Sequence, residues 1–240
     1  MDKKYIVFAI IVIVIIYFAF QYILSEKDVI KSNDMFITSE ANGGLNSLKN
    51  KIKPGVISDF GYSFWIYVKS WDNEHVKNII SHGVQECGST FKREIKLGQN
   101  ANNLTIEIPH SNEESGASCG KSELNIANIP LQRWVHIAVT VHNRSLDLYL
   151  NGKMVKTSIM TGVPAANDAG SSLVICNPEE TYSGKFSRFS YHEKALNPRD
   201  VRAIYAKGPE PTGLLGGLFG KYKIKLLFMK GSDKVSEFSV

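Results

Sequence analysis

The sequence predicts an all-β domain, a sandwich of two antiparallel sheets, with a transmembrane helix before it and one short helix near its end. Short runs of β-branched and aromatic residues recur between turn residues from about residue 56 to 208, without strand–helix–strand alternation. A single helix-start signal stands late in the chain, at Asn197–Asp200. The first 30 residues contain a long run without a formal charge, which is typical of a membrane span.

The composition narrows the class of protein. Of the 240 residues, 43% are hydrophobic and 21% charged, which allows a packed core and excludes wholesale disorder. The net charge of +5 is too small to indicate a nucleic-acid-binding protein, so we expect no nucleic-acid partner. Cys87 and Cys119 lie in loop-like stretches and can pair if the domain is exported, whereas Cys176 lies in an apolar strand. The alternative, in which all three cysteines are reduced, is supported almost as well as a Cys87–Cys119 disulfide.

The N-terminal segment predicts that the chain is anchored in a membrane. Residues 5–24 span roughly 30 Å as a helix, the thickness of a bilayer's hydrocarbon core, and residues 1–4 form a short tail before them. A cleaved signal peptide is the alternative, but its apolar region is shorter and ends in small residues, whereas Phe20–Leu24 is bulky. Lysines flank both ends of the span, so orientation is weakly determined, and we favour the tail inside. Residues 25–55 read as a polar connector.

The predicted strands follow in order. They are Gly61–Val68, Leu104–Ile108, Trp134–Val141, Ser145–Leu150, Lys153–Thr157, Leu173–Cys176 and Gly184–His192. Asn151 and Gly152 predict a two-residue type I′ hairpin, because both positions tolerate a positive φ. Asn197 is the expected N-cap of the late helix, Pro198 its first residue, and Gly208 its end.

Two of these strands carry a specific signature. Arg133–Thr140 reads RWVHIAVT and Leu146–Lys153 reads LDLYLNGK, so that Trp134, His136, Asn151 and Gly152 stand at fixed spacing. An opening strand with Trp65 and a closing Gly184–Lys185–Phe186 strand surround them. Over residues 56–208 the chain resembles laminin-G-like, concanavalin-A-like domains. The resemblance implies a jelly roll of two antiparallel sheets with a binding or structural role.

Enzymatic and metal chemistry find little support in the sequence. Concanavalin-A-like glycosidases need two carboxylates in one cleft, about 5–9 Å apart, and their E-x-D-x-x-E strand does not occur here. The adjacent pairs Glu113–Glu114 and Glu179–Glu180 read as solvated loop acids. Many relatives bind calcium, yet Ser187 and Arg188 stand where those relatives carry acids, so we expect no calcium and no cofactor.

The C-terminal residues 209–240 form a basic, glycine-rich arm. Lys221, Lys223 and Lys225 alternate with Tyr222 and Ile224, the period of a strand with one basic face. Two readings of this strand are balanced. It is either an added edge strand or an interaction arm that pairs with a partner subunit or lies on anionic lipid.

Two functional hypotheses follow from the sequence. The first is a non-catalytic, single-pass membrane protein whose jelly roll docks a protein partner near a bilayer. By analogy with similar proteins of large DNA viruses, its partners would be capsid or other assembly subunits, and its place a virion between inner membrane and capsid. The second is a membrane-tethered lectin that binds glycans through loops such as Ser111–Ser122 and Gly162–Ser172. These loops contain no Trp, Tyr or Phe to stack on sugar rings, which weakens it.

Overall fold

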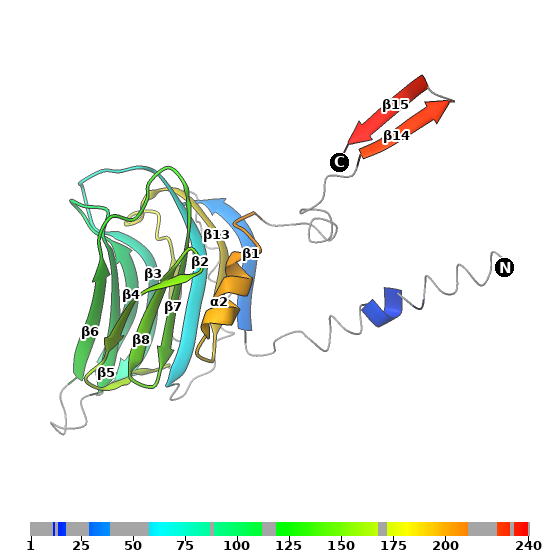
Figure 1. Cartoon of the computed structure of the whole chain (residues 1–240). Coiled ribbons are helices and arrows are strands. Elements are labelled where there is room, and N and C mark those ends of the chain that lie inside the picture. The colour runs from blue at the N-terminus through cyan, green and yellow to red at the C-terminus, as the bar shows by residue number, and fades with distance from the viewer. Residues whose placement is uncertain are drawn as a thin grey trace.

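The computed structural model describes residue 12 and residues 14–17, 29–38, 58–86, 89–111, 119–167, 172–210, 225–230 and 233–239. Two antiparallel sheets pack face to face, and a short helix, α2 (Pro198–Tyr205), lies across the outside of one of them (Figure 1). The predicted all-β class, the two antiparallel sheets and the short late helix are confirmed. This arrangement fits a jelly-roll sandwich.

The first sheet has six strands. Their spatial order is β1 (Val29–Ile37), β13 (Ser183–His192), β2 (Asp59–Ser70), β7 (Trp134–His142), β8 (Ser145–Leu150) and β9 (Lys153–Ile159). The β8–β9 turn is made by Asn151 (φ 49°) and Gly152 (φ 76°), the positive values that an Asn-Gly hairpin adopts.

The second sheet has seven strands. Their order is β10 (Val163–Pro164), β5 (Leu104–Ser111), β4 (Ser89–Leu97), β3 (Lys77–Glu86) and β11 (Ala166–Asn167), with β12 (Leu173–Ile175) also on β3 and β6 (Cys119–Ile126) on β5. A separate two-stranded sheet is formed by β14 (Lys225–Lys230) and β15 (Asp233–Ser239).

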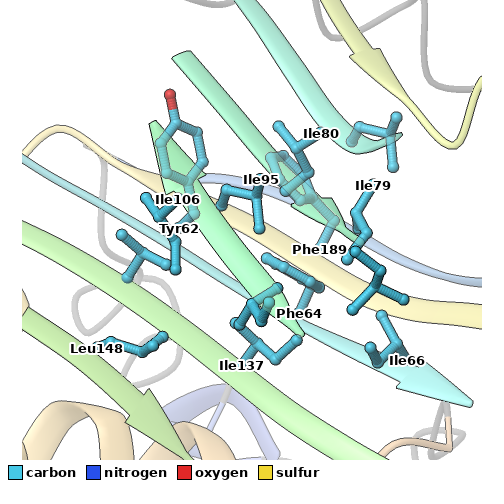
Figure 2. Packing of buried hydrophobic residues seen from close by; sticks show 14 of the residues in the cluster. Tyr62, Phe64, Ile66, Ile79, Ile80, Ile95, Ile106, Ile137, Leu148 and Phe189 are labelled. Carbon is cyan, nitrogen blue, oxygen red and sulfur yellow. The ribbon is translucent and has the colours of Figure 1, made fainter. Parts of the chain in front are cut away.

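The core lies between the two large sheets because each contributes alternate apolar side chains to the space between them. Tyr62, Phe64 and Ile66 of β2 point toward Ile80 and Ile95 of the opposite sheet (Figure 2). All five are at most 1% exposed. At about 25 cal/mol per Å² of apolar surface removed from water, this burial is the main stabilising contribution to the fold.

The late helix begins as the sequence predicts. The Asn197 side chain accepts a hydrogen bond from the Asp200 backbone N–H at 2.9 Å, and the Asp200 carboxylate accepts one from the Asn197 backbone N–H. This reciprocal pair satisfies two N–H groups that the first turn leaves free. Val201 is the one buried residue of α2 and holds it against the six-stranded sheet.

The structure corrects the predicted connector over residues 25–55. Val29–Ile37 is strand β1, which pairs with β13 from Val29–His192 to Ile37–Lys185. The buried Thr38 then accepts a hydrogen bond from the Gly184 backbone N–H at 3.1 Å. The polar residues of this segment indicate a loop, but pairing with β13 and the contact of Phe36 with Phe186 hold it as a strand.

Two terminal predictions lie largely outside the described residues. Of the predicted span over 5–24, residue 12 and residues 14–17 are described and helical. In the described part of the chain we find no helix with the length and apolarity needed to cross a membrane. Within the C-terminal arm, Lys221, Tyr222, Lys223 and Ile224 lie outside the described residues, and Lys225 is the first residue of β14.

Candidate binding surfaces

The signature residues lie together on the outer face of the six-stranded sheet, under α2. Trp65 of β2 stands opposite His136 of β7. The Trp65 ring stacks on Tyr205 of α2, with ring centroids 5.4 Å apart and planes 18° apart. The Asn151 side chain accepts a hydrogen bond from the His136 backbone N–H at 3.0 Å.

The position of Gly152 under α2 leaves no room for a side chain, because a Cβ there would lie 2.9 Å from the Tyr205 ring. Trp134 is half-buried beside Tyr67.

His136 is buried and neutral at pH 7. Its Nε2 atom lies 2.9 Å from the Ser63 hydroxyl, and its ring centroid lies 5.1 Å from that of Trp65. Burial disfavours the imidazolium and lowers the pKa of His136 to about 4. These contacts give His136 a packing role between the sheet and the helix.

The outer face of the seven-stranded sheet carries charged side chains. Glu94 of β4 and Glu107 of β5 stand opposite one another in the ladder. The Lys96 ammonium lies 2.6 Å from Glu107 and 3.4 Å from Glu94, and Lys121 lies 2.7 Å from the other Glu107 oxygen. Burial opposes ionisation of Glu107, but the hydrogen bonds and charges of Lys121 and Lys96 together outweigh it and lower the pKa of Glu107.

A small pocket opens beside this charged group, where β3, β12 and the turn after β12 meet. Its volume is about 110 Å³, and it is lined by Asn78, Ile79, Ser81, Lys92, Val174, Cys176, Asn177 and Glu180. The Asn78 side-chain N–H donates to the Glu180 carboxylate at 3.1 Å. The side-chain oxygen of Asn78 is buried and has no hydrogen-bond partner among the described residues.

Strand β9 forms an exposed edge. It ends the six-stranded sheet and pairs with β8 on one side. None of its seven residues is buried, and Met154, Val155 and Ile159 are 48%, 47% and 68% exposed. An edge strand with large exposed apolar side chains is a ready template for pairing with another strand.

The loop before β3 holds a group of possible metal ligands, Asp72, Glu74 and His75, whose ligand atoms lie within 4.8 Å of one another. The buried Lys77 ammonium donates to the backbone carbonyls of Asp72 (2.7 Å) and His75 (2.9 Å) and pairs with the Asp72 carboxylate at 3.0 Å. The hydrogen bond from Lys77 is the largest effect that lowers the pKa of Asp72. Lys77 therefore already engages one carboxylate oxygen and two backbone carbonyl oxygens of this group.

A buried polar cluster ties the sheets together near β10 and β11. Arg93 is 1% exposed, lies 4.0 Å from the centre of the Phe60 ring and donates to the Ala165 carbonyl. The Tyr62 hydroxyl lies 2.6 Å from Nδ1 of His82. Burial, aided by the Arg93 charge, lowers the pKa of His82 to about 3. The cluster holds the segment around Ala165 in place.

The cysteines differ in state. Cys119 is disulfide-bonded, while Cys87, its expected partner, lies outside the described residues. Cys176 is a buried free thiol, and burial raises its pKa to about 12. Of the loops expected to bind glycans, residues 112–118 and 168–171 lie outside the described residues, as does the Glu113–Glu114 pair.

With this geometry established, the family can be stated. The profile of the concanavalin A-like lectin/glucanases superfamily matches residues 42–202, more than half of the chain. The chain belongs to this superfamily. No curated protein matches the chain in sequence.

Two solved structures similar to the chain show the range of the likeness. The chain is similar to a botulinum neurotoxin serotype G binding domain at 16% identity and a TM-score of 0.48, covering 75% of this chain and 45% of that one. It is also similar to domain 4 of an extracellular arabinanase from Geobacillus stearothermophilus, solved with arabinotriose. The identity is 16% and the TM-score 0.45, and the match covers 63% of this chain and 68% of that one. The chain spans between a third and a half of the neurotoxin structures that it matches.

Proposed function

We propose that the chain is a non-catalytic, membrane-anchored interaction protein whose sandwich holds a protein partner close to a bilayer. The family contains both lectins and glucanases by its description, so the carboxylates bear on the choice between binding and hydrolysis. The observation that supports the non-catalytic part of the proposal is the Glu94–Glu107 pair, which Lys96 bridges. A glycosidase needs one protonated carboxyl group as its acid. Lysines engage both oxygens of Glu107 and its pKa is lowered, which disfavours the protonated form that this role requires.

The proposed membrane location is supported by the sequence of the N-terminal segment alone. Residues 5–24 supply the proposed single-pass anchor, because their length matches a bilayer's apolar core. Such a protein would suit the space between an inner membrane and a capsid, as a minor virion component of a large DNA virus. Its partners there would be assembly subunits.

Cross-linking mass spectrometry on membranes or particles that contain the full chain tests this proposal. We expect lysines of the sandwich to link reproducibly to one other protein. Hydrolysis assays on polysaccharide panels should show no turnover with the purified chain. Measurable turnover that Glu107→Gln abolishes would refute the non-catalytic assignment.

A lectin is the second candidate, and the pocket at Asn78 favours it. Amide, hydroxyl and carboxylate groups line the pocket, and groups of these kinds form hydrogen bonds with sugar hydroxyls. A glycan array probed with the full chain in detergent decides between the candidates. Sugar binding that Asn78→Ala removes, and that Asn125→Ala on the exposed part of β6 leaves intact, would support the lectin.

A further inference from the structure

We infer that strand β9 is the docking edge of this protein, and that its occupant is an extended segment of another protein in which acidic and apolar residues alternate. The inference rests on the proposed interaction function and names the surface and the chemistry of the partner. The occupant adds a strand to the six-stranded sheet, through backbone hydrogen bonds along β9.

Exposure distinguishes β9 from the strands beside it. Most residues of β7 and half of those of β8 are buried, whereas β9 has six exposed residues and one half-buried residue, Ser158. Met154 stands opposite Tyr149, and Ile159 opposite Ser145. A register shift between Leu148 and Tyr149 bends the ladder at this point. The apolar side chains of β9 therefore project from a strand that forms a ladder with β8 alone among the described strands, although β6 of the other sheet and α2 also contact it.

The positive charges on β9 favour a partner strand that carries acidic residues. The strand carries Lys153 and Lys156 and no acidic residue. The Lys156 ammonium donates to the Asn125 carbonyl at 2.8 Å, which turns it toward the other sheet. A second copy of β9 would bring like charges together, which disfavours self-pairing. A strand with glutamate or aspartate instead gains opposite-charge pairs across the ladder.

The backbone of β9 favours a polypeptide over a lipid surface. An edge strand presents a row of N–H and C=O groups that only another extended chain can pair in register. Lipid headgroups could neutralise Lys153, but they offer no matching ladder of donors and acceptors. A protein strand satisfies the backbone, the apolar side chains and the lysines together.

The test uses the full chain in detergent and two labelled, end-blocked seven-residue peptides, one alternating valine with glutamate and one alternating valine with lysine. Fluorescence anisotropy measures binding. We expect the glutamate peptide to bind and the lysine peptide to bind at least about tenfold more weakly, since opposite charges across a ladder attract and like charges repel. Size-exclusion chromatography with light scattering should show no β9-dependent dimer.

Three variants locate the site. Val155→Pro should abolish binding because proline removes a ladder donor and its ring blocks a neighbouring strand, whereas Val155→Thr keeps strand propensity and should bind normally. Lys153→Glu should reverse the preference toward the lysine peptide, which keeps the inference testable even if Val155→Pro does not fold. Equal binding of both peptides, or unchanged binding by folded Val155→Pro, overturns the inference. If these fail while cross-links to a partner persist at other lysines, the interaction function stands and the docking edge does not.

Discussion

The outer faces of the two large sheets contrast in what lies on them. On the six-stranded sheet, α2 covers Trp65 and His136, and the contacts are aromatic and buried. On the seven-stranded sheet, the buried Glu107 carboxylate pairs with the half-buried Lys96 and the exposed Lys121. Both faces belong to antiparallel strands, so strand geometry does not explain the difference. The residues that follow β13 explain it, because they form α2 on the outer face of the six-stranded sheet, whereas no described helix packs on the seven-stranded sheet.

The largest expected effect comes from removing the stacking contact between Trp65 and Tyr205 of α2. Trp65→Ala should lower the free energy of unfolding by about 3–5 kcal/mol, because Trp65 is 5% exposed and stacks on Tyr205. Denaturant unfolding monitored by circular dichroism measures the loss. Trp134→Ala is the matched control, since Trp134 is only half-buried, and it should cost clearly less. Equal losses would mean that α2 adds little to the sheet.

Lowering the pH should reduce the free energy of unfolding, because His136 under α2 becomes protonated. Its folded-state pKa of about 4 lies below the unfolded value of 6.5, so the unfolded chain binds the proton first as the pH falls. Stability should decline between pH 6.5 and 4, at up to about 1.4 kcal/mol per pH unit and about 3 kcal/mol in total. Unfolding free energies across this range, compared with those of His136→Gln, isolate the contribution. The same slope in both proteins would contradict it.

The stability of the loop before β3 should depend on the buried ammonium group of Lys77. Lys77→Met should destabilise the fold by about 2 kcal/mol, because the carbonyls of Asp72 and His75 lose a charged donor. Thermal unfolding measures this, with Lys69→Met at an exposed position of β2 as the control. If both variants unfold alike, Lys77 does not organise the loop.

The smallest effect is expected on the open face. Glu107→Gln should cost about 1 kcal/mol at pH 7, because it weakens two partly solvated ion pairs. The lowered pKa of Glu107 means that its stabilisation exists above the unfolded pKa and disappears as the pH falls through the folded one. The variant and the native chain should therefore converge in stability in acid. A difference that persists at low pH would point to packing instead of charge.

Sequence patterns revealed those parts of the fold where side chains alternate between water and core. Trp134–Val141 and the Asn151–Gly152 turn were predictable for that reason, and so was the N-cap at Asn197. Strand β1 was not predicted, because its middle, Lys31–Asp34, is polar, although Phe36 packs against the core. Strand β4 carries Lys92, Glu94 and Lys96 on its outer side and the buried Arg93 inside, which hides its alternation.

The candidate sites depended on chain regions distant in sequence. Asn78 and Glu180 meet only when β3 and the turn after β12 come together, so no local motif marks the pocket. The exposed edge of β9 was equally hidden. The segment Lys153–Thr157 predicts a strand, but only the strand order shows that this strand ends its sheet.

Backbone hydrogen exchange along β9 tests most directly how this protein binds. Exchange at residues 153–159 is measured by mass spectrometry for the chain alone and for the chain in the partner complex isolated by cross-linking. We predict fast exchange in the isolated chain and strong protection of these residues in the complex, with β8 unchanged. Protection confined to other strands, with β9 exchanging equally fast in both samples, would contradict the account.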